Sequence, residues 1–175
     1  ASTHVGEEAV AGTVHQTLKS KHNKLLSVIA PRHPERGEAI ANELISAGLR
    51  VARRAINDPI TAETDIYLAD TLGELGLFFR LCPISFMGKS LFNLGGQNPL
   101  EPARLDCAIL FGPHMWNFSD ITQRLVDAEA AETVADPAAL GTAIANLLDD
   151  QQFRQQRADN ALRTVAAQSG ILDTV

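Results

Sequence analysis

The stretch that decides the fold covers residues 84–111 and reads ISFMGKSLFNLGGQNPLEPARLDCAILF. It begins and ends with short apolar runs, residues 84–87 and 108–111, which are typical of buried strands. A glycine pair, Gly95 and Gly96, separates the first run from a proline-led helical segment at residues 99–105. Because a strand, a helix and a second strand follow one another, the stretch predicts a parallel β-α-β unit.

The same alternation extends in both directions from this unit. Further strands are expected at residues 25–30, 49–52 and 65–69, and further helices at 35–47, 74–81, 119–128, 137–149 and 151–167. Ser119 is expected to cap the helix that it begins. The pattern therefore predicts an α/β fold, a parallel sheet with helices on both faces, in one domain over residues 1–175.

Composition excludes several classes of function. The formal net charge is -6 and the basic residues are spread along the chain, which argues against a nucleic-acid-binding surface. No apolar run is as long as a membrane span, and no signal peptide opens the sequence. The spacing of histidines and cysteines predicts no metal site. Cys82 and Cys107 adjoin apolar runs, so we expect reduced, buried thiols of a cytosolic protein.

Polar clusters follow the predicted strands repeatedly. They lie at residues 31–34, 70–75, 88–90 with 95–96, and 112–114. Because ligands of parallel sheets bind at the carboxyl ends of the strands, the clusters indicate a binding site there. Arg32 offers a planar fork suited to a phosphate, His33 can donate to the same anion, and Lys89 adds a charge. The glycine pair and the helix start favour a phosphate as well, so we expect a nucleotide or nucleotide-sugar site.

Structural explanations of the same residues are kept open. Residues 95–103 can be a plain loop-to-helix junction, Arg32 can pair with Glu35, and His33 and His114 can be structural histidines. Asp70 and Glu74 are expected to cap the helix at 74–81 and not to act as catalytic acids. His15 and His22 are expected to be solvated, on or just after a polar helix face.

Several of these motifs, in this order, resemble one family. They are Ser2-Thr3-His4, Gly6-Glu7-Glu8, Pro31-Arg32-His33-Pro34-Glu35-Arg36, Gly73-Glu74-Leu75, Gly95-Gly96, Asn98-Pro99-Leu100-Glu101-Pro102-Ala103 and Gly112-Pro113-His114 with Asn117-Phe118. Together they resemble the C-terminal half of bacterial 3-deoxy-D-manno-octulosonic acid (Kdo) transferases. The resemblance implies a GT-B glycosyltransferase, whose Rossmann-like C-terminal domain binds the donor CMP-Kdo.

The resemblance also implies roles for matching residues. Arg32 and His33 would hold the donor phosphate. Gly73, Glu74 and Leu75 would line the cytosine pocket, largely through backbone groups. The remaining positions are Gly95, Gly96 and Asn98 near the phosphate and ribose, Glu101 on the ribose hydroxyls, and Ser2 and Thr3 at the rim next to the N-terminal half. Val5, Lys89 and Gln97 differ from the residues that the family usually carries at those positions.

The implied reaction is inverting transfer of Kdo from CMP-Kdo to a lipid A precursor, with no cofactor or metal. The general base that activates the acceptor hydroxyl is expected in an N-terminal domain. That domain is also expected to bind the acceptor and to attach the protein to the cytoplasmic face of the inner membrane. No catalytic residue is therefore expected in this chain, and the isolated domain is expected to bind the donor without transferring Kdo. Residues 1–3 are expected to be the carboxyl end of a strand that lies centrally in the family's sheet. Either another segment, copy or chain is expected to fill the place of the rest of this strand, or the domain is expected to be a fragment of a longer protein.

The alternative is a non-catalytic, Rossmann-like module that binds a nucleotide or a protein partner. Val5 and Lys89 favour this alternative, because both lie in or near the expected donor site. A nucleotide-sugar epimerase fits less well, because the glycine fingerprint expected near the first strand is absent.

Overall fold

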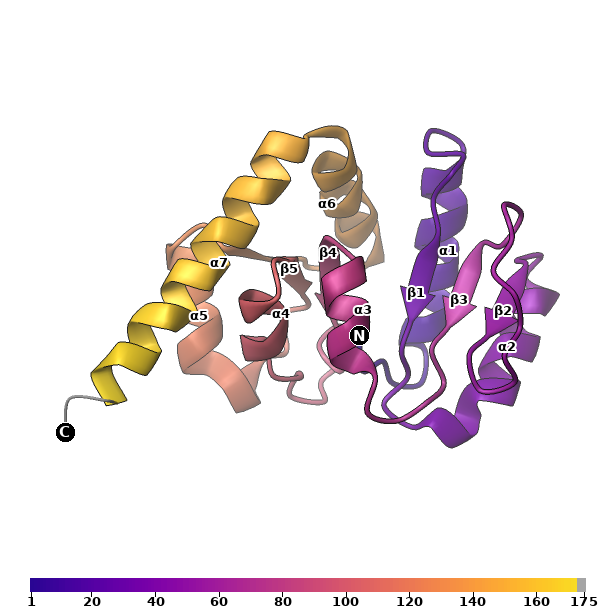
Figure 1. Ribbon diagram of the computed structural model, residues 1–175, viewed down its shortest axis with the longest axis horizontal. Coiled ribbons are helices and arrows are strands. Elements are labelled where there is room, and N and C mark those ends of the chain that lie inside the picture. The colour runs from indigo at the N-terminus through magenta and orange to yellow at the C-terminus, as the bar shows by residue number, and fades with distance from the viewer. Residues whose placement is uncertain (173–175) are drawn as a thin grey trace. The chain divides into compact units, whose positions relative to one another are not determined.

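The computed structural model describes residues 1–172, and side chains as far as residue 167. Short parallel strands alternate with helices along the chain (Figure 1), which confirms the expected α/β class with parallel strands. The chain divides into two compact units, Ala1–Leu75 and Gly76–Val175, and each is described by itself. No helix within residues 1–172 is long and apolar enough to span a membrane.

The first unit is a three-stranded parallel sheet with two α-helices. Its elements are α1 (Glu7–Lys19), β1 (Ser27–Ile29), the 3₁₀ helix η1 (Pro34–Arg36), α2 (Gly37–Ser46), β2 (Val51–Arg53) and β3 (Ile66–Leu68). The strand order is β1-β3-β2, with β3 in the centre (Figure 1). Thr3 pairs with Pro31 in a single parallel bridge, so the start of the chain lies beside the carboxyl end of β1.

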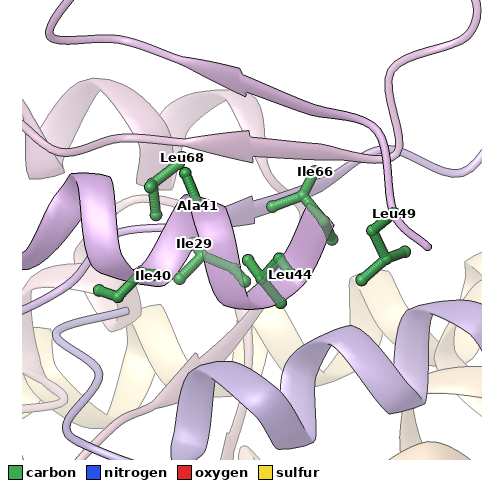
Figure 2. Packing of buried hydrophobic residues seen from close by; sticks show 7 residues of the cluster. All are labelled: Ile29, Ile40, Ala41, Leu44, Leu49, Ile66 and Leu68. Atoms are coloured by element: carbon green, nitrogen blue, oxygen red, sulfur yellow. The ribbon is translucent and has the colours of Figure 1, made fainter. Parts of the chain in front are cut away.

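The core of the first unit is formed by α2 and the strands beneath it. Figure 2 shows seven of its side chains, which are Ile29, Ile40, Ala41, Leu44, Leu49, Ile66 and Leu68. Helix α1 packs closely on this core, because a Cβ atom on Gly12 would lie 2.8 Å from a methyl carbon of Leu44. The buried face of α1 includes Glu7, Glu8 and His15, and this explains why apolar periodicity did not reveal a core helix here.

The second unit has a separate three-stranded parallel sheet. Its elements are α3 (Leu75–Leu81), which starts at the unit boundary, β4 (Ile84–Met87), α4 (Leu100–Arg104), β5 (Ala108–Phe111), the 3₁₀ helix η2 (Trp116–Phe118), α5 (Ser119–Asp127), β6 (Ala131–Thr133), α6 (Pro137–Asp149) and α7 (Gln151–Leu172). The strand order is β4-β5-β6, and all four residues of β5 are buried. Helices α6 and α7 both contact β5.

Three local expectations differ from the structure. Ser119 does not cap α5: the cap position is Phe118, and the Thr122 hydroxyl bonds to the carbonyl groups of Phe118 and Ser119 instead. Pro99 occupies the cap position of α4 and not its first helical residue. Strand β6 was not expected, because three residues with only one of them buried are too short for a periodic signal.

Candidate functional site

The carboxyl end of β1 presents the cation that the sequence indicates for a phosphate. Arg32 is exposed, and its backbone N–H donates to the Thr3 carbonyl oxygen at 2.9 Å. Within the described chain, its guanidinium takes part in no recorded ion pair. The suggested pairing of Arg32 with Glu35 is therefore wrong, because Glu35 lies 3.4 Å from Nδ1 of His33. Arg32 is left available to an anion.

His33 is the neighbouring side chain on this loop. It is about half exposed, and its ring meets the ring of His4 edge to face at a centroid distance of 5.6 Å. The Glu35 carboxylate lies 3.4 Å from Nδ1 and helps to fix the direction of the ring. His33 therefore has an oriented ring on an accessible loop.

Ser2 and Thr3 lie next to this loop, but the Thr3 side chain is used inside the protein. Thr3 is only 4% exposed, and its hydroxyl donates to Oε1 of Glu8 at 3.0 Å. Its backbone N–H donates to Ala30. Ser2 is half-buried and has a φ of 54°, in the left-handed region. The contacts of Thr3 fasten the N-terminal residues to the end of β1.

Asp70, at the carboxyl end of β3, is a structural residue. Its Oδ1 accepts a hydrogen bond from the backbone N–H of Ala55 at 2.8 Å, and its Oδ2 accepts one from Nε of Arg53 at 2.9 Å. Its side chain is fully buried. A Cβ atom on Gly37 would lie 2.2 Å from Oδ2, so the start of α2 is also pressed against this carboxylate. Asp70 thus joins the ends of three segments, and the expectation that it caps α3 is wrong.

Glu74 ends the loop that follows β3, and a double hydrogen bond from Arg54 holds it. Nε of Arg54 donates to Oε2 at 3.1 Å, Nη2 donates to Oε1 at 2.7 Å, and the Thr71 hydroxyl donates to Oε2 at 2.5 Å. The hydrogen bonds from Arg54 and Thr71 lower the pKa of Glu74 to about 2. Glu74 is therefore a fixed carboxylate at neutral pH. Gly73 before it has a φ of 81°, which favours glycine.

Sequence analysis missed the arginines at the end of β2. Arg53 is the last residue of β2, and Arg54 follows it directly. Strand β2 belongs to the same parallel sheet as β1 and β3. The rule that singled out Arg32 applies to them equally, because the ends of parallel strands meet at one edge. The signal was the Arg-Arg pair after a short apolar run.

In the second unit, the glycine pair is required by contacts within the protein. Gly95 and Gly96 are buried and have φ values of 94° and 78°. A Cβ atom on Gly95 would lie 2.3 Å from the Asn117 amide nitrogen, and one on Gly96 would lie 2.2 Å from the Met115 sulfur. Lys89 also has a left-handed φ, 62°, and its carbonyl oxygen accepts from Gly96 at 2.7 Å. The loop after β4 is thus folded tightly onto residues 115–117.

Asn98 and Glu101 lie at the start of α4. Oδ1 of Asn98 accepts from the backbone N–H of Leu100 at 3.0 Å, so this side chain closes a tight turn just before the helix. Helix α4 has only five residues, and its dipole is correspondingly small. Glu101 is exposed, and no hydrogen bond to its carboxylate is recorded among residues 1–172. Glu101 is therefore free to accept hydrogen bonds from hydroxyl groups.

His15 is not solvated, contrary to expectation. It is 1% exposed, its Nδ1 lies 2.8 Å from Oγ of Ser27, and its Nε2 lies 3.6 Å from Oδ1 of Asp65. Burial lowers the pKa of His15 below its usual value. Asp65 is also bound by Lys19 and Arg50. This cluster lies where β1 and β3 begin, at the opposite edge from Arg32.

The cysteines and potential metal ligands add no chemistry to the site. Cys107 is buried, its Sγ lies 3.1 Å from the Phe79 carbonyl oxygen, and burial raises its pKa to about 12. Cys82 is half-buried, and both thiols are free. His22 is partly buried as well. The described residues contain no group of three or more His, Cys, Asp or Glu side chains arranged to hold a metal ion.

Comparison with known proteins gives consistent results. No family model matches the chain. It is 34% identical over 173 residues to the 3-deoxy-D-manno-octulosonic acid transferase of Haemophilus influenzae, covering 98% of this chain and 40% of that protein. It is 39% identical over 129 residues to a probable mitochondrial 3-deoxy-D-manno-octulosonic acid transferase of Arabidopsis thaliana, covering 73% and 29%. The chain thus spans about two fifths of the length of the first curated relatives.

Two solved structures resemble this one. The C-terminal CMP-Kdo binding domain of WaaA from Acinetobacter baumannii superposes with a TM-score of 0.89 at 30% identity, covering 94% of this chain and 86% of that one. The C-terminal domain of a group 1 glycosyl transferase, LpcC, from Francisella tularensis has a TM-score of 0.63 at 16% identity, covering 91% and 76%. The fold is that of the C-terminal domain of a GT-B glycosyltransferase. Within that class, the chain belongs to the Kdo transferase family.

Proposed function

We propose that residues 1–175 form the domain that binds CMP-Kdo in a Kdo transferase. The observation that carries this proposal is the likeness to the CMP-Kdo binding domain from Acinetobacter baumannii over 94% of the chain. The exposed guanidinium of Arg32 supports it, because a planar fork with no ion-pair partner among the described side chains suits a phosphate group. The ring of His33 lies on the same loop and supplies a second donor.

The second unit is proposed to contribute through the backbone near Gly95, Gly96 and Asn98 and through the Glu101 carboxylate. Glu101 has acceptor oxygens exposed to solvent, and ribose hydroxyls are donors. The tight packing of Gly95 and Gly96 against residues 115–117 makes their loop rigid, which favours a fixed set of backbone groups over an adaptable one. The cytosine ring of the donor is proposed to contact the backbone of Gly73, Glu74 and Leu75.

The reaction of the whole protein is proposed to be inverting transfer of Kdo to a lipid A precursor. Its leaving group is CMP, whose phosphate gains charge in the transition state. Donors aimed at this phosphate stabilise that charge, and the loss of one such donor commonly lowers the rate by about 10²–10³-fold. The acceptor site, the base that activates the acceptor hydroxyl and the attachment to the cytoplasmic face of the inner membrane are assigned to the N-terminal part of such a protein.

Calorimetric titration of the chain with CMP, UMP and AMP tests the proposal. CMP is expected to bind most tightly, and equal or tighter binding of UMP or AMP would contradict a CMP-sugar site. A second measurement separates the enzyme from the non-catalytic alternative. If the domain prefers CMP but the full-length protein transfers no Kdo from CMP-Kdo to a lipid A precursor, the chain is a nucleotide-binding module without catalysis.

A further inference from the structure

The loop between β3 and α3 has few attachments of its own. No backbone hydrogen bond is recorded for residues 71–73 in the described part of the chain. Leu72 is 78% exposed, and a Cβ atom on Gly73 would meet nothing within 4 Å. The loop is therefore held mainly by the side chains of Thr71 and Glu74, which bond to each other at 2.5 Å.

Arg54 connects this loop to the sheet. The backbone N–H of Arg54 donates to the Leu68 carbonyl oxygen at 2.9 Å, so its main chain continues the pairing of β2 with β3. Its side chain makes the double hydrogen bond to Glu74, with both carboxylate oxygens accepting. This planar, two-point contact fixes direction as well as distance. The hydrogen bond to Glu74, and to a smaller extent the one to Tyr67, raises the pKa of Arg54. The guanidinium that holds Glu74 is therefore charged at every ordinary pH.

We propose that Arg54 is a positioning residue for base recognition, which orients the backbone of residues 73–75 through Glu74. This inference rests on the proposed function, in which that backbone meets the cytosine. Cytosine and uracil differ in which ring positions donate and which accept. Fixed backbone N–H and C=O groups therefore discriminate between them strongly, because the wrong base leaves polar groups unpaired. A loop released from Arg54 can adjust to either base.

The test measures the affinities of CMP, UMP and cytidine for wild type and Arg54→Met. The variant is expected to lower the ratio of CMP to UMP affinity about tenfold, while the ratio of CMP to cytidine affinity is unchanged. Arg50→Met is the matched control, because Arg50 is also paired with carboxylates, Asp65 and Glu63, but at the opposite edge of the same sheet. This control is expected to keep the wild-type base preference even if it lowers the unfolding temperature.

Glu74→Gln and the double variant complete the test. If Arg54 acts through Glu74, the double variant is expected to lose no more base preference than Arg54→Met alone. An unchanged ratio of CMP to UMP affinity in folded Arg54→Met overturns the inference. A fall only in the ratio of CMP to cytidine affinity also overturns it, because Arg54 would then be a phosphate ligand. If Arg54→Met does not fold, Arg54→Lys decides by the same ratio, with about a threefold reduction expected. A wild type without preference for CMP overturns the proposed function itself.

Discussion

The buried carboxylate of Glu8 accepts hydrogen bonds from both terminal nitrogens of Arg36, at 3.0 and 3.3 Å. Glu8 is 1% exposed and belongs to α1, whereas Arg36 ends η1 and is partly exposed. Arg36→Met leaves this charge buried, and among the side chains of residues 1–167 only the Thr3 hydroxyl still donates to it. We expect the free energy of unfolding to fall by about 1.5–3 kcal/mol, measured by urea denaturation. Glu35→Gln, on an exposed pair, is the control, and equal losses in both variants would contradict the prediction.

Asp65 is expected to make the protein sensitive to acid. Burial opposes its ionisation, but hydrogen bonds from Arg50 and Lys19 lower its pKa well below the usual value of 3.8. Because the folded-state pKa is the lower one, the stabilisation is complete above about pH 4 and is lost as the pH falls below it. Asp65→Asn is expected to be less stable at pH 7 and to show a weaker fall in stability between pH 4 and pH 2. Denaturant titrations across this range measure both effects, and an unchanged slope would show that Asp65 does not titrate as expected.

Gly112 cannot accept a side chain without movement of the backbone. A Cβ atom there would lie 2.2 Å from the carbonyl oxygen of Ser90, whose hydroxyl also accepts from the Gly112 N–H at 2.8 Å. Gly112→Ala is expected to destabilise the protein by roughly 1–3 kcal/mol, measured by thermal or urea unfolding. Gly141→Ala is the matched control, because alanine in the interior of α6 favours the helix. Similar effects of the two substitutions would disprove the steric explanation.

Arg32→Ala is expected to weaken CMP binding tenfold or more, because a charge-assisted hydrogen bond to phosphate contributes about 1.5–3 kcal/mol. Cytidine, which lacks the phosphate, is expected to bind almost as before. Titration calorimetry with both ligands measures the difference, and Arg124→Ala, an exposed arginine on α5, serves as the control. Equal losses for CMP and cytidine would mean that Arg32 supports the fold and not the phosphate.

Glu101→Gln is expected to weaken CMP binding, because the substitution turns one acceptor oxygen into a donor group. The 2′,3′-dideoxy analogue of CMP is the control ligand, since it lacks the hydroxyl groups that Glu101 is proposed to accept from. It is expected to bind wild type and variant about equally poorly in the same titration. If the affinity of the analogue still differs strongly between the two proteins, Glu101 does not bind the ribose hydroxyls. The proposal that α4 contacts the nucleotide would then be wrong.

Local sequence signals predicted the central elements well. Strands β4 and β5 have the expected bounds, because each is a short apolar run enclosed by turn-forming residues. Helix α6 has the expected bounds, residues 137–149, and Oδ1 of Asp136 caps it at 2.8 Å. Where burial does not follow apolarity, the signals failed. His15 is the clearest case, because the buried face of α1 also carries two glutamates, so no local signal shows that Ser27 and Asp65 will bury this ring.

The sequence by itself determined the class of fold, the family and the clusters that follow the strands, because apolar periodicity, turn residues and short motifs are local properties of the chain. Only the tertiary structure decided which charged side chains pair. Arg36 could have met Glu35 or Glu38 nearby, yet it reaches Glu8, and Arg54 reaches Glu74 across 20 positions. Such pairs form where the packing of a sheet and its helices brings distant residues together and removes water from one of them, and this is set by the fold as a whole.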